Sequence, residues 1–400
     1  MVEEEMEVRV SVPVLASIGA LRGAFHNMRG VIWQPFVLSL GVPMKSLGGL
    51  ESLLSLIRIG VQPVVGRASD AHGRRRFIIA RELLTLVAGV LLVFTRSWTL
   101  PLIGVIFFGL ETAIYPIWST LIAESVEPTR LGYTYSVLGT CTTAAGLVAA
   151  LAAGYLAEAY GYHTVFAIAT GLALVALVIV VVKLPETKEP QPGFGLGLRD
   201  LASSLFETLR PPPHLRGFYV AMTVDLLAFG MGYFLMFGML VKGYGYTPYM
   251  LGILSAVTTG AMTLFQIPLG RHVDRFGYVK YLALSQVLAC LVLGIVVVTK
   301  EFWAVLAAQV VMGFAGALWG PAEQAWIANN VDPEERAQAL GSYSAFRGLL
   351  SFPGPFIGGM LFDAYGFNVP MILNIVIAIV DIVLILTLVK DRPPGSPRMG

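Results

Sequence analysis

Charged side chains are scarce in this sequence. Asp, Glu, Lys and Arg make up 13% of the 400 residues, whereas a typical soluble domain has about 25%. Hydrophobic residues reach 56%, and the mean hydropathy is +0.74. A water-soluble fold cannot cover that much apolar side chain, because folded monomers rarely expose large contiguous apolar patches. Most of the surface is therefore expected to face lipid, which predicts a polytopic membrane protein.

Cysteine, net charge and catalytic motifs are scarce as well. Cys141 and Cys290 both lie in apolar segments, which excludes a disulfide framework and a cysteine metal cluster. The net charge of 27 − 25 = +2 is too small for nucleic-acid binding by charge alone. There is no Walker A loop, HExxH or GxSxG motif, so we expect neither an enzyme nor a metal or cofactor. The acidic start, Met1–Arg9, predicts no secretory signal.

Twelve apolar stretches are long enough to cross a bilayer, for which a helix needs about 20 residues. The predicted fold class is an all-α membrane protein with twelve transmembrane helices. They are expected at residues 12–40, 47–65, 77–95, 100–124, 131–158, 162–184, 217–241, 247–270, 278–299, 302–329, 337–362 and 367–389.

One long polar stretch separates the sixth helix from the seventh. It contains Pro190, Pro192 and the run Pro211–Pro213, which is typical of a linker. Within it, Leu198–Leu209 alternates at helical spacing and is expected to lie along the membrane surface. The predicted domains are an N-terminus (1–11), a six-helix bundle (12–184), the linker (185–216), a second six-helix bundle (217–389) and a tail (390–400).

Lys and Arg are unevenly shared between the two sets of loops. With both termini in the cytoplasm, the inner segments hold eighteen of these residues and the outer loops hold four. Because cytoplasmic loops carry an excess of Lys and Arg, both termini are predicted to be cytoplasmic. The protein is expected in the cell (plasma) membrane, as a monomer.

The two halves of the sequence repeat each other. At an offset of 204, Gly66, Asp70 and Gly73 match Gly270, Asp274 and Gly277. At an offset of 205, Pro116, Gly154, Tyr160 and Gly161 match Pro321, Gly359, Tyr365 and Gly366. Two six-helix bundles in parallel repeat are an arrangement known among transporters.

The loop from Gly66 to Arg76, GRASDAHGRRR, resembles the GxxxD(R/K)xGR(R/K) loop of the major facilitator superfamily. This resemblance implies secondary transport by alternating access between two pseudo-symmetric bundles. In that family the loop aspartate closes the cytoplasmic side. The residues that the resemblance assigns to this gate are Gly66, Asp70, Gly73, Arg74 and Arg75, with Gly270, Asp274 and Gly277 as a weaker mirror.

A second fragment, with Gly354, Pro355, Gly358 and Gly359, has the sequence GPxxGG. It resembles the fifth-helix motif of drug–proton antiporters, although here it stands in the eleventh predicted helix. The fifth helix has AALAAG instead, and the arginine expected in the fourth helix is missing. A proline beside closely spaced glycines predicts a kinked helix that another helix can approach closely.

Ionisable residues inside predicted spans are candidate sites, because each costs at least about 2.5–3.5 kcal/mol on insertion scales. In the first helix, helical spacing puts Arg22, His26, Arg29 and Trp33 on one face. Other candidates for substrate or proton binding are Glu111, Tyr115 and Trp118 in the fourth helix, Asp225 in the seventh, Trp319 and Glu323 in the tenth, and Arg347 in the eleventh. The alternatives are a positive face kept for packing and a Glu111 neutralised by Arg22 or Arg347.

Four further ionisable residues are given structural roles. Arg58 is expected at the interface of the bundles. Arg81 and Glu82 are expected near the inner end of the third helix, where they can snorkel to the membrane surface. Asp381 is interpreted as structural, because the twelfth helix is peripheral in the family.

Without a nucleotide site, transport energy must come from a gradient, and His26, Glu111, Asp225 and Glu323 favour protons. The favoured function is proton-coupled efflux of small amphipathic or drug-like molecules, because the Met- and Phe-rich run after Asp225 suits adaptable recognition. The same run can also face lipid. Arg22, Arg29 and Arg347 favour an alternative, uptake or exchange of an anionic metabolite. A transporter-like sensor or lipid-moving protein is an alternative of another class.

Overall fold

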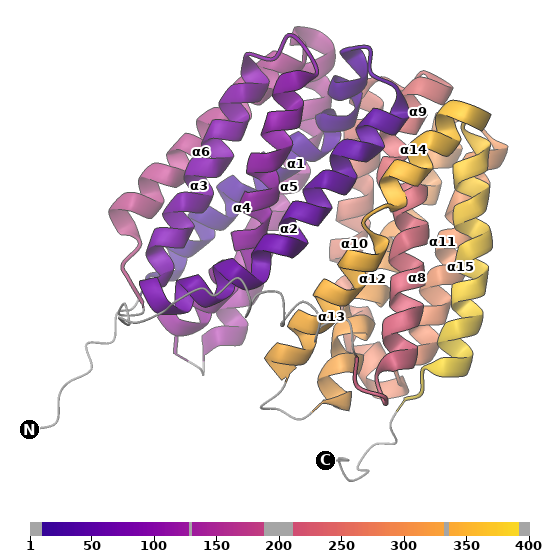
Figure 1. Cartoon of the computed structure of the whole chain (residues 1–400). Coiled ribbons are helices and arrows are strands. Elements are labelled where there is room, and N and C mark those ends of the chain that lie inside the picture. The colour runs from indigo at the N-terminus through magenta and orange to yellow at the C-terminus, as the bar shows by residue number, and fades with distance from the viewer. Residues whose placement is uncertain (1–9, 128–129, 188–210, 332–335, 392–400) are drawn as a thin grey trace, which may run out of the picture. The chain divides into compact units, whose positions relative to one another are not determined.

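The structure is a computed structural model that describes residues 10–127, 130–187, 211–331 and 336–391 (Figure 1). The side chains of Arg271, Asp274, Phe276 and residues 336–338 lie outside this description. So does the predicted surface segment Leu198–Leu209. Over the described residues the chain forms helices and no β-strand, which confirms the predicted all-α class.

The first half consists of six long helices. They are α1 (Val12–Ser39), α2 (Met44–His72), α3 (Arg74–Val93), α4 (Thr99–Ser125), α5 (Leu131–Tyr160) and α6 (Tyr162–Lys183). Most of their ends lie within a few residues of the predicted ones, but α2 continues seven residues further than expected, to His72. The motif that begins at Gly66 is therefore mostly the last turns of α2 rather than a loop. The turn itself is Gly73, whose φ of 91° is a conformation that side chains with a Cβ rarely adopt.

The second half contains two divided spans. The predicted seventh helix consists of α8 (Arg216–Met231), the short 3₁₀ helix η2 (Tyr233–Leu235) and α9 (Met236–Tyr244). The predicted eleventh consists of α13 (Arg336–Ser351) and α14 (Gly354–Tyr365), separated at Pro353. The remaining helices are α10 (Pro248–Phe276), α11 (Val279–Val298), α12 (Phe302–Asn330) and α15 (Asn368–Leu388).

Local chemistry accounts for both breaks. Pro353 and Pro355 cannot donate backbone hydrogen bonds to the preceding turn, so a helix cannot run through them unchanged. At Gly232 the side chain of Asn374, on α15, occupies the place of a Cβ, and its Oδ1 accepts from the Tyr233 N–H at 3.4 Å. The continuous seventh helix that hydropathy predicts is therefore wrong in this detail, whereas the break at Pro353 falls beside the fragment for which a kink is expected.

Eight helical spans of the described residues are long and apolar enough to cross a membrane by length and composition, when Arg216–Tyr244 (α8, η2 and α9) is counted as one span. The helices α1, α2 and α3 are not among them, and neither are the halves of the divided eleventh span. The first three carry ionisable residues in their interiors, namely Arg22, Arg29, Glu51, Arg58, Arg81 and Glu82. These charged side chains therefore need partners within the protein.

The described residues form two compact units. Unit 1 takes its residues from Met1–Ile32 and Ile57–Leu201, and unit 2 from Trp33–Leu56 and Ala202–Gly400. Unit 2 thus includes the end of α1 and the start of α2. Gln34 shows why, because its Nε2 donates to the Phe234 carbonyl at 2.5 Å and its Oε1 accepts from the Gly238 N–H at 2.8 Å.

Each unit has a core of apolar side chains from several helices. In unit 1 the core includes Leu15, Ile78, Ile117 and Leu121. In unit 2 it includes Phe218, Trp326 and Ile385, and the rings of Phe218 and Trp326 stack with centroids 4.1 Å apart. The core of unit 1 fixes the position of α3 against α4, and that of unit 2 fixes α8 against α12. These positions decide where the charged residues of the same helices meet.

Candidate functional site

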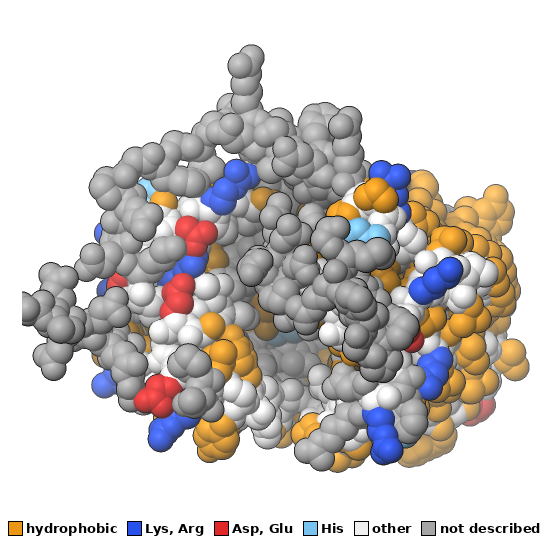
Figure 2. All heavy atoms as spheres, turned by 90° about the horizontal axis from the view of Figure 1, so that it is seen from below, with side chains coloured by type: hydrophobic (Ala, Val, Ile, Leu, Met, Phe, Trp, Pro, Cys, Tyr) orange, Lys and Arg blue, Asp and Glu red, His pale blue; other side chains and the backbone are white. Residues whose placement is uncertain are grey.

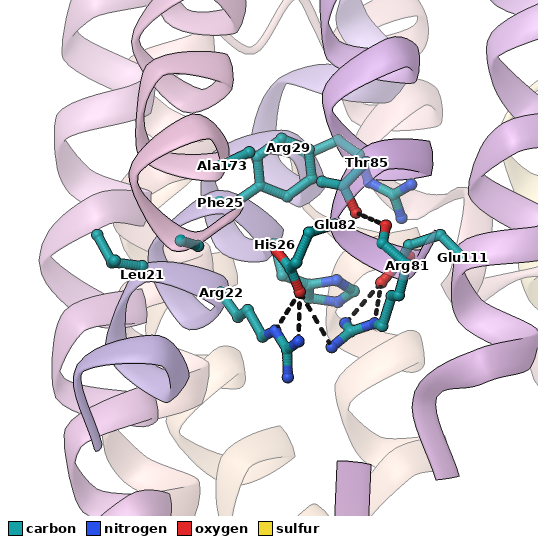
Figure 3. A pocket seen from close by; sticks show the side chains of 11 residues that line it. Leu21, Arg22, Phe25, His26, Arg29, Arg81, Glu82, Thr85, Glu111 and Ala173 are labelled. Atoms are coloured by element: carbon teal, nitrogen blue, oxygen red, sulfur yellow. Dashed lines mark hydrogen bonds and ion pairs between the residues drawn. The ribbon is translucent and has the colours of Figure 1, made fainter. Parts of the chain in front are cut away.

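A pocket lies inside unit 1 between α1, α3, α4 and α6 (Figure 3). Its walls combine ionisable and apolar side chains: Leu21, Arg22, Phe25, His26, Arg29, Arg81, Glu82, Thr85, Glu111, Ala173 and Ala176. Four of the residues proposed from sequence, Arg22, His26, Arg29 and Glu111, meet here. The helical stripe on α1 therefore faces a pocket as far as Arg29.

Ion pairs run through this pocket as a chain. The Arg22 Nε–H donates to Glu82 Oε1 at 2.6 Å, and Arg81 Nη1 lies 4.0 Å from the same oxygen. Arg81 also holds Glu111, with Nε and Nη2 at 2.7 and 2.5 Å from Oε1. The order Arg22–Glu82–Arg81–Glu111 links α1, α3 and α4, as the dashed lines in Figure 3 show.

The roles expected for Arg81 and Glu82 were wrong. The exposed fractions of their side chains are 9% and 3%, so neither side chain snorkels to a membrane surface. Arg81 stands seven residues into α3, about 10 Å from its start at 1.5 Å per residue, which places it deep in the helix. It is Arg81, rather than Arg22 or Arg347, that neutralises Glu111.

Three guanidinium groups of this region lie over aromatic rings. Arg22 is 4.2 Å from the centroid of Trp118, Arg29 is 4.2 Å from that of Phe108, and Arg81 is 5.3 Å from that of Tyr115. A cation over a ring face gains about 0.5–2 kcal/mol, more when it is desolvated. The aromatic residues predicted on the fourth helix thus hold the protein's own cations.

Trp33 does not extend the stripe into the pocket. It belongs to unit 2, where its side chain is buried and its Nε1–H donates to Glu51 Oε1 at 3.0 Å. The first-helix stripe is therefore divided between two units.

A second, partly buried ion pair lies in unit 2. Glu323 of α12 pairs with Arg347 of α13 and also accepts from the Tyr343 hydroxyl. The Trp319 Nε1–H donates to the other carboxylate oxygen at 2.9 Å. Glu323, Arg347 and Trp319, three residues proposed from sequence, are thus brought together, whereas Trp326 is part of the core.

Asp225 lies apart from that pair, in a polar cluster of α8, α11 and α15. The Gln286 amide donates to Asp225 Oδ1 and to Asp381 Oδ2, the latter at 3.1 Å. All three side chains are buried. Sequence reasoning missed Gln286, because a glutamine carries no charge that marks it inside an apolar span.

The turn at Gly73 is organised by ion pairs. Asp70 Oδ1 lies 2.6 Å from Arg74 Nη2, and the same nitrogen lies 3.2 Å from Glu124 Oε1. Arg74 is buried and Asp70 is exposed. Figure 2 shows acidic and basic side chains close together on the face seen from below. The sequence motif thus forms an ion-paired turn, to which Glu124 adds a carboxylate that the motif does not contain.

Glu186 caps this turn from the end of the first half. Its Oε1 accepts from the backbone N–H groups of Arg74 and Arg75 at 2.6 and 3.1 Å. A carboxylate is favourable there, because the first N–H groups of a helix have no partner within the helix. The Arg75 Nη2–H donates to the Val181 carbonyl at 2.7 Å, which ties the start of α3 to α6.

The second half has the same cap at the same place in the repeat. Gly277 has a φ of 93°, and the Asp391 carboxylate accepts from the N–H groups of Tyr278 and Val279 at 3.0–3.3 Å. Asp391 stands 205 positions after Glu186, so the repeat offset could have revealed both. The Asp274 side chain lies outside the described residues. Gly66 and Gly270 have open space where a Cβ would stand, so close packing does not require glycine there.

The GPxxGG fragment is a crossing point of helices within unit 2. A Cβ on Gly358 would clash with the Met231 carbonyl, and one on Gly354 would stand 2.8 Å from the Leu227 carbonyl, both on α8. A Cβ on Gly359 would clash with the Met44 carbonyl of α2, and the backbone of Pro355 fills the corresponding place beside Gly48. The motif therefore lets α14 touch α8 and α2 backbone to backbone.

Helices long and apolar enough to cross a membrane, with ion pairs between neighbouring helices, define the class as a multi-pass membrane protein. The chain matches the family profile of the Major Facilitator Superfamily over residues 15–250 and 231–399. The chain belongs to this superfamily.

Known relatives agree with the assignment at low identity. Multidrug resistance protein MdtG of Proteus mirabilis is 23% identical over 313 residues, which cover 76% of each chain. Maltose permease of Geobacillus stearothermophilus is 24% identical over 360 residues, which cover 88% of each. The crystal structure of the nucleoside transporter NupG covers 95% of this chain and 100% of its own, with a TM-score of 0.80 and 12% identity. That likeness shows the fold alone.

Proposed function

We propose that this chain is a secondary active transporter that works by alternating access and exports small amphipathic molecules in exchange for protons. The observation that carries the proposal is the buried chain Arg22–Glu82–Arg81–Glu111 on the wall of a pocket. The resemblance to multidrug resistance protein MdtG favours export and an amphipathic substrate. Proton coupling is argued from the residues themselves.

Glu111 is the proposed coupling residue. It pairs with Arg81 in a largely buried setting, where an uncompensated charge is costly. Protonation of Glu111 removes this pair and leaves the Arg81 guanidinium in need of another anion. Arrival of a proton is thereby linked to the charge that the pocket presents to a substrate.

The charge of the pocket indicates what the substrate carries. Among the lining residues, three arginines face two glutamates, a surplus of one positive charge when His26 is left aside. Phe25, Ala173 and Ala176 supply apolar wall. A substrate with an apolar body and one acidic group fits this combination.

A second candidate function is uptake or exchange of an anionic metabolite. The same surplus of positive charge favours it, and all three arginines of the pocket lie over aromatic rings that help to hold them in place. The two functions differ in direction and in the apolar part of the substrate.

The remaining features of the proposal concern topology. We place both termini in the cytoplasm on the Lys and Arg count, with the ion-paired turn around Gly73 on the cytoplasmic side as a gate. All residues that line the pocket come from unit 1 of one chain, so the protein is proposed to work as a monomer.

Flux in proteoliposomes tests the coupling. With an imposed pH gradient, the parent should accumulate an amphipathic anion against its gradient. Glu111→Gln mimics the protonated residue permanently, so it should abolish this accumulation and keep the binding affinity within about tenfold, or 1.4 kcal/mol. The matched control is Glu158→Gln, which changes an exposed glutamate of α5 and should transport as the parent does.

Two results would contradict the proposal. Uphill transport by Glu111→Gln at the parent's rate would remove Glu111 from the coupling. Transport by the parent that is indifferent to the pH gradient would exclude protons as the driving ion. Direction is read separately, by comparing accumulation in inside-out and right-side-out vesicles.

A further inference from the structure

Unit 2 contains two acidic residues that share one amide. Asp225 on α8 and Asp381 on α15 both accept from the Nε2 of Gln286 on α11. Asp381 has an exposed fraction of 0%, and the other two side chains are also buried. The amide must present its nitrogen, because its oxygen would be repelled by both carboxylates.

One carboxylate oxygen of this cluster has no hydrogen bond. Asp381 Oδ1 is buried and lacks a partner among the described residues, whereas Oδ2 of the same group accepts from Gln286. A buried acceptor of this kind is expensive, and an ionised one far more so. The arrangement lacks one positive charge or one proton.

The charged groups around the two aspartates lead to the same conclusion, that one positive charge is missing. Arg347 interacts electrostatically with both aspartates, but its guanidinium is already paired with Glu323. One arginine therefore faces three carboxylates. The other titratable groups that face the cluster are Tyr343 and Cys290, neither of which supplies a cation.

A proton suits the unpartnered Oδ1 of Asp381 better than a metal cation does. Hard cations need several oxygen ligands around them. Here the N–H groups of Gln286 stand between the carboxylates, where such a cation would have to sit. Two buried carboxylates that accept from the same amide favour the binding of one proton by the pair, because neighbouring like charges disfavour double ionisation.

We propose that Asp225 and Asp381 share one proton and form a second protonation site of this chain, distinct from Glu111 and confined to unit 2. The functional part of this inference rests on the proposed proton-coupled transport. It deepens that function by adding a site at which a second proton is held and released.

The place of the site in the fold connects it to helix packing. Asp225 stands six residues before the end of α8 at Met231, whose carbonyl packs against Gly358 of α14. Loss of the shared proton puts two negative charges on the facing surfaces of α8 and α15. Their repulsion would loosen the contact of these helices next to the α8 break.

Infrared spectroscopy of the whole protein in detergent tests the site without a transport assay. A pH titration should show the C=O stretch of a protonated carboxylic acid well above pH 4, the ordinary pKa of aspartate being about 3.9. Asp381→Asn and Asp225→Asn should each remove this band, because the carboxylate that is left no longer has a like charge beside it. Asp363→Asn is the matched control, since Asp363 caps α2 and pairs with Lys242, and it should keep the band.

The outcomes separate this site from the proposed function. A band that persists unchanged in both Asp225→Asn and Asp381→Asn, with the variants folded by gel filtration, overturns the shared proton. A band that disappears on replacing KCl with NaCl at constant ionic strength overturns the choice of a proton over a cation. If the band behaves as expected while the parent shows no pH-driven flux, the site stands and the proton-coupled function fails.

Discussion

Replacing Arg81 with glutamine should destabilise the protein by about 3–5 kcal/mol, the cost of removing one partner from a buried ion pair. The Arg81 and Glu111 side chains have exposed fractions of 9% and 12%, and two nitrogens of the guanidinium approach one carboxylate oxygen at 2.5–2.7 Å. Without Arg81, Glu111 keeps a buried negative charge and no partner of opposite sign at that distance. An exposed pair, by contrast, contributes only about 0–1 kcal/mol.

A double-mutant cycle isolates this interaction. The double variant Arg81→Gln with Glu111→Gln removes both charges together, so it should lose much less stability than the sum of the two single variants. We expect a coupling energy of about 2–3 kcal/mol. The control cycle uses Arg130 and Glu127, whose Nε–Oε2 distance is 3.7 Å and whose exposed fractions are 78% and 33%. That cycle should give a coupling energy near zero.

The measurement is chemical unfolding in detergent micelles followed by tryptophan fluorescence. Substrate binding gives an independent reading of the same charges. Arg81→Gln should weaken the binding of an anionic probe, because it removes the surplus positive charge of the pocket. If the stability losses of the two single variants add within about 0.5 kcal/mol, Arg81 and Glu111 do not interact as argued.

Three further predictions concern the turn and the helix crossing. Asp70→Asn should lower the free energy of unfolding by at most about 1 kcal/mol, because Asp70 is exposed. It should nevertheless raise the labelling of cysteine side chains from the proposed cytoplasmic side. Unchanged labelling with normal flux would exclude a gate. Gly358→Ala should markedly lower the midpoint of thermal unfolding, because the added Cβ has no room beside α8. Gly171→Ala is the control and should leave the midpoint unchanged, because the space around Gly171 is open. Equal midpoints for the two variants would contradict the close crossing of the helices. Glu186→Gln should lower the free energy of unfolding by about 0.5–2 kcal/mol, because it weakens the cap of α3. The same unfolding assay measures this loss, and an unchanged free energy would mean that the N–H groups of the first turn find other partners.

The loop motif shows which contacts can be predicted from local sequence and which cannot. The first copy of the loop motif marks the turn between α2 and α3, where Asp70 pairs with Arg74 beside the positive-φ residue Gly73. Glu124 and Glu186 join the same turn from 50 and 112 residues away along the chain. Nothing in the local sequence around either residue marks it as a partner of α3.

The seventh and eleventh spans show the limit of hydropathy. A hydropathy window averages over about 19 residues, so it detects an apolar stretch whether the helix is continuous or divided. Asn374 and the prolines decide the breaks, and Asn374, on α15, does so through a contact with Gly232 and Tyr233 that exists only after folding. The apolar length was thus predictable and the break at Gly232 was not.

The sequence by itself determined the membrane class, the number of spans and the repeat, because length, hydropathy and motif spacing are properties of neighbouring residues. It also placed ionisable residues inside the spans, including Arg22, Glu111 and Asp225. The tertiary structure decided which of them pair. Glu111 meets Arg81 rather than Arg22, and Asp225 meets Gln286. Such pairs depend on the rotation and depth of each helix against its neighbours, and these are set by packing of whole helix faces rather than by the residues that finally touch.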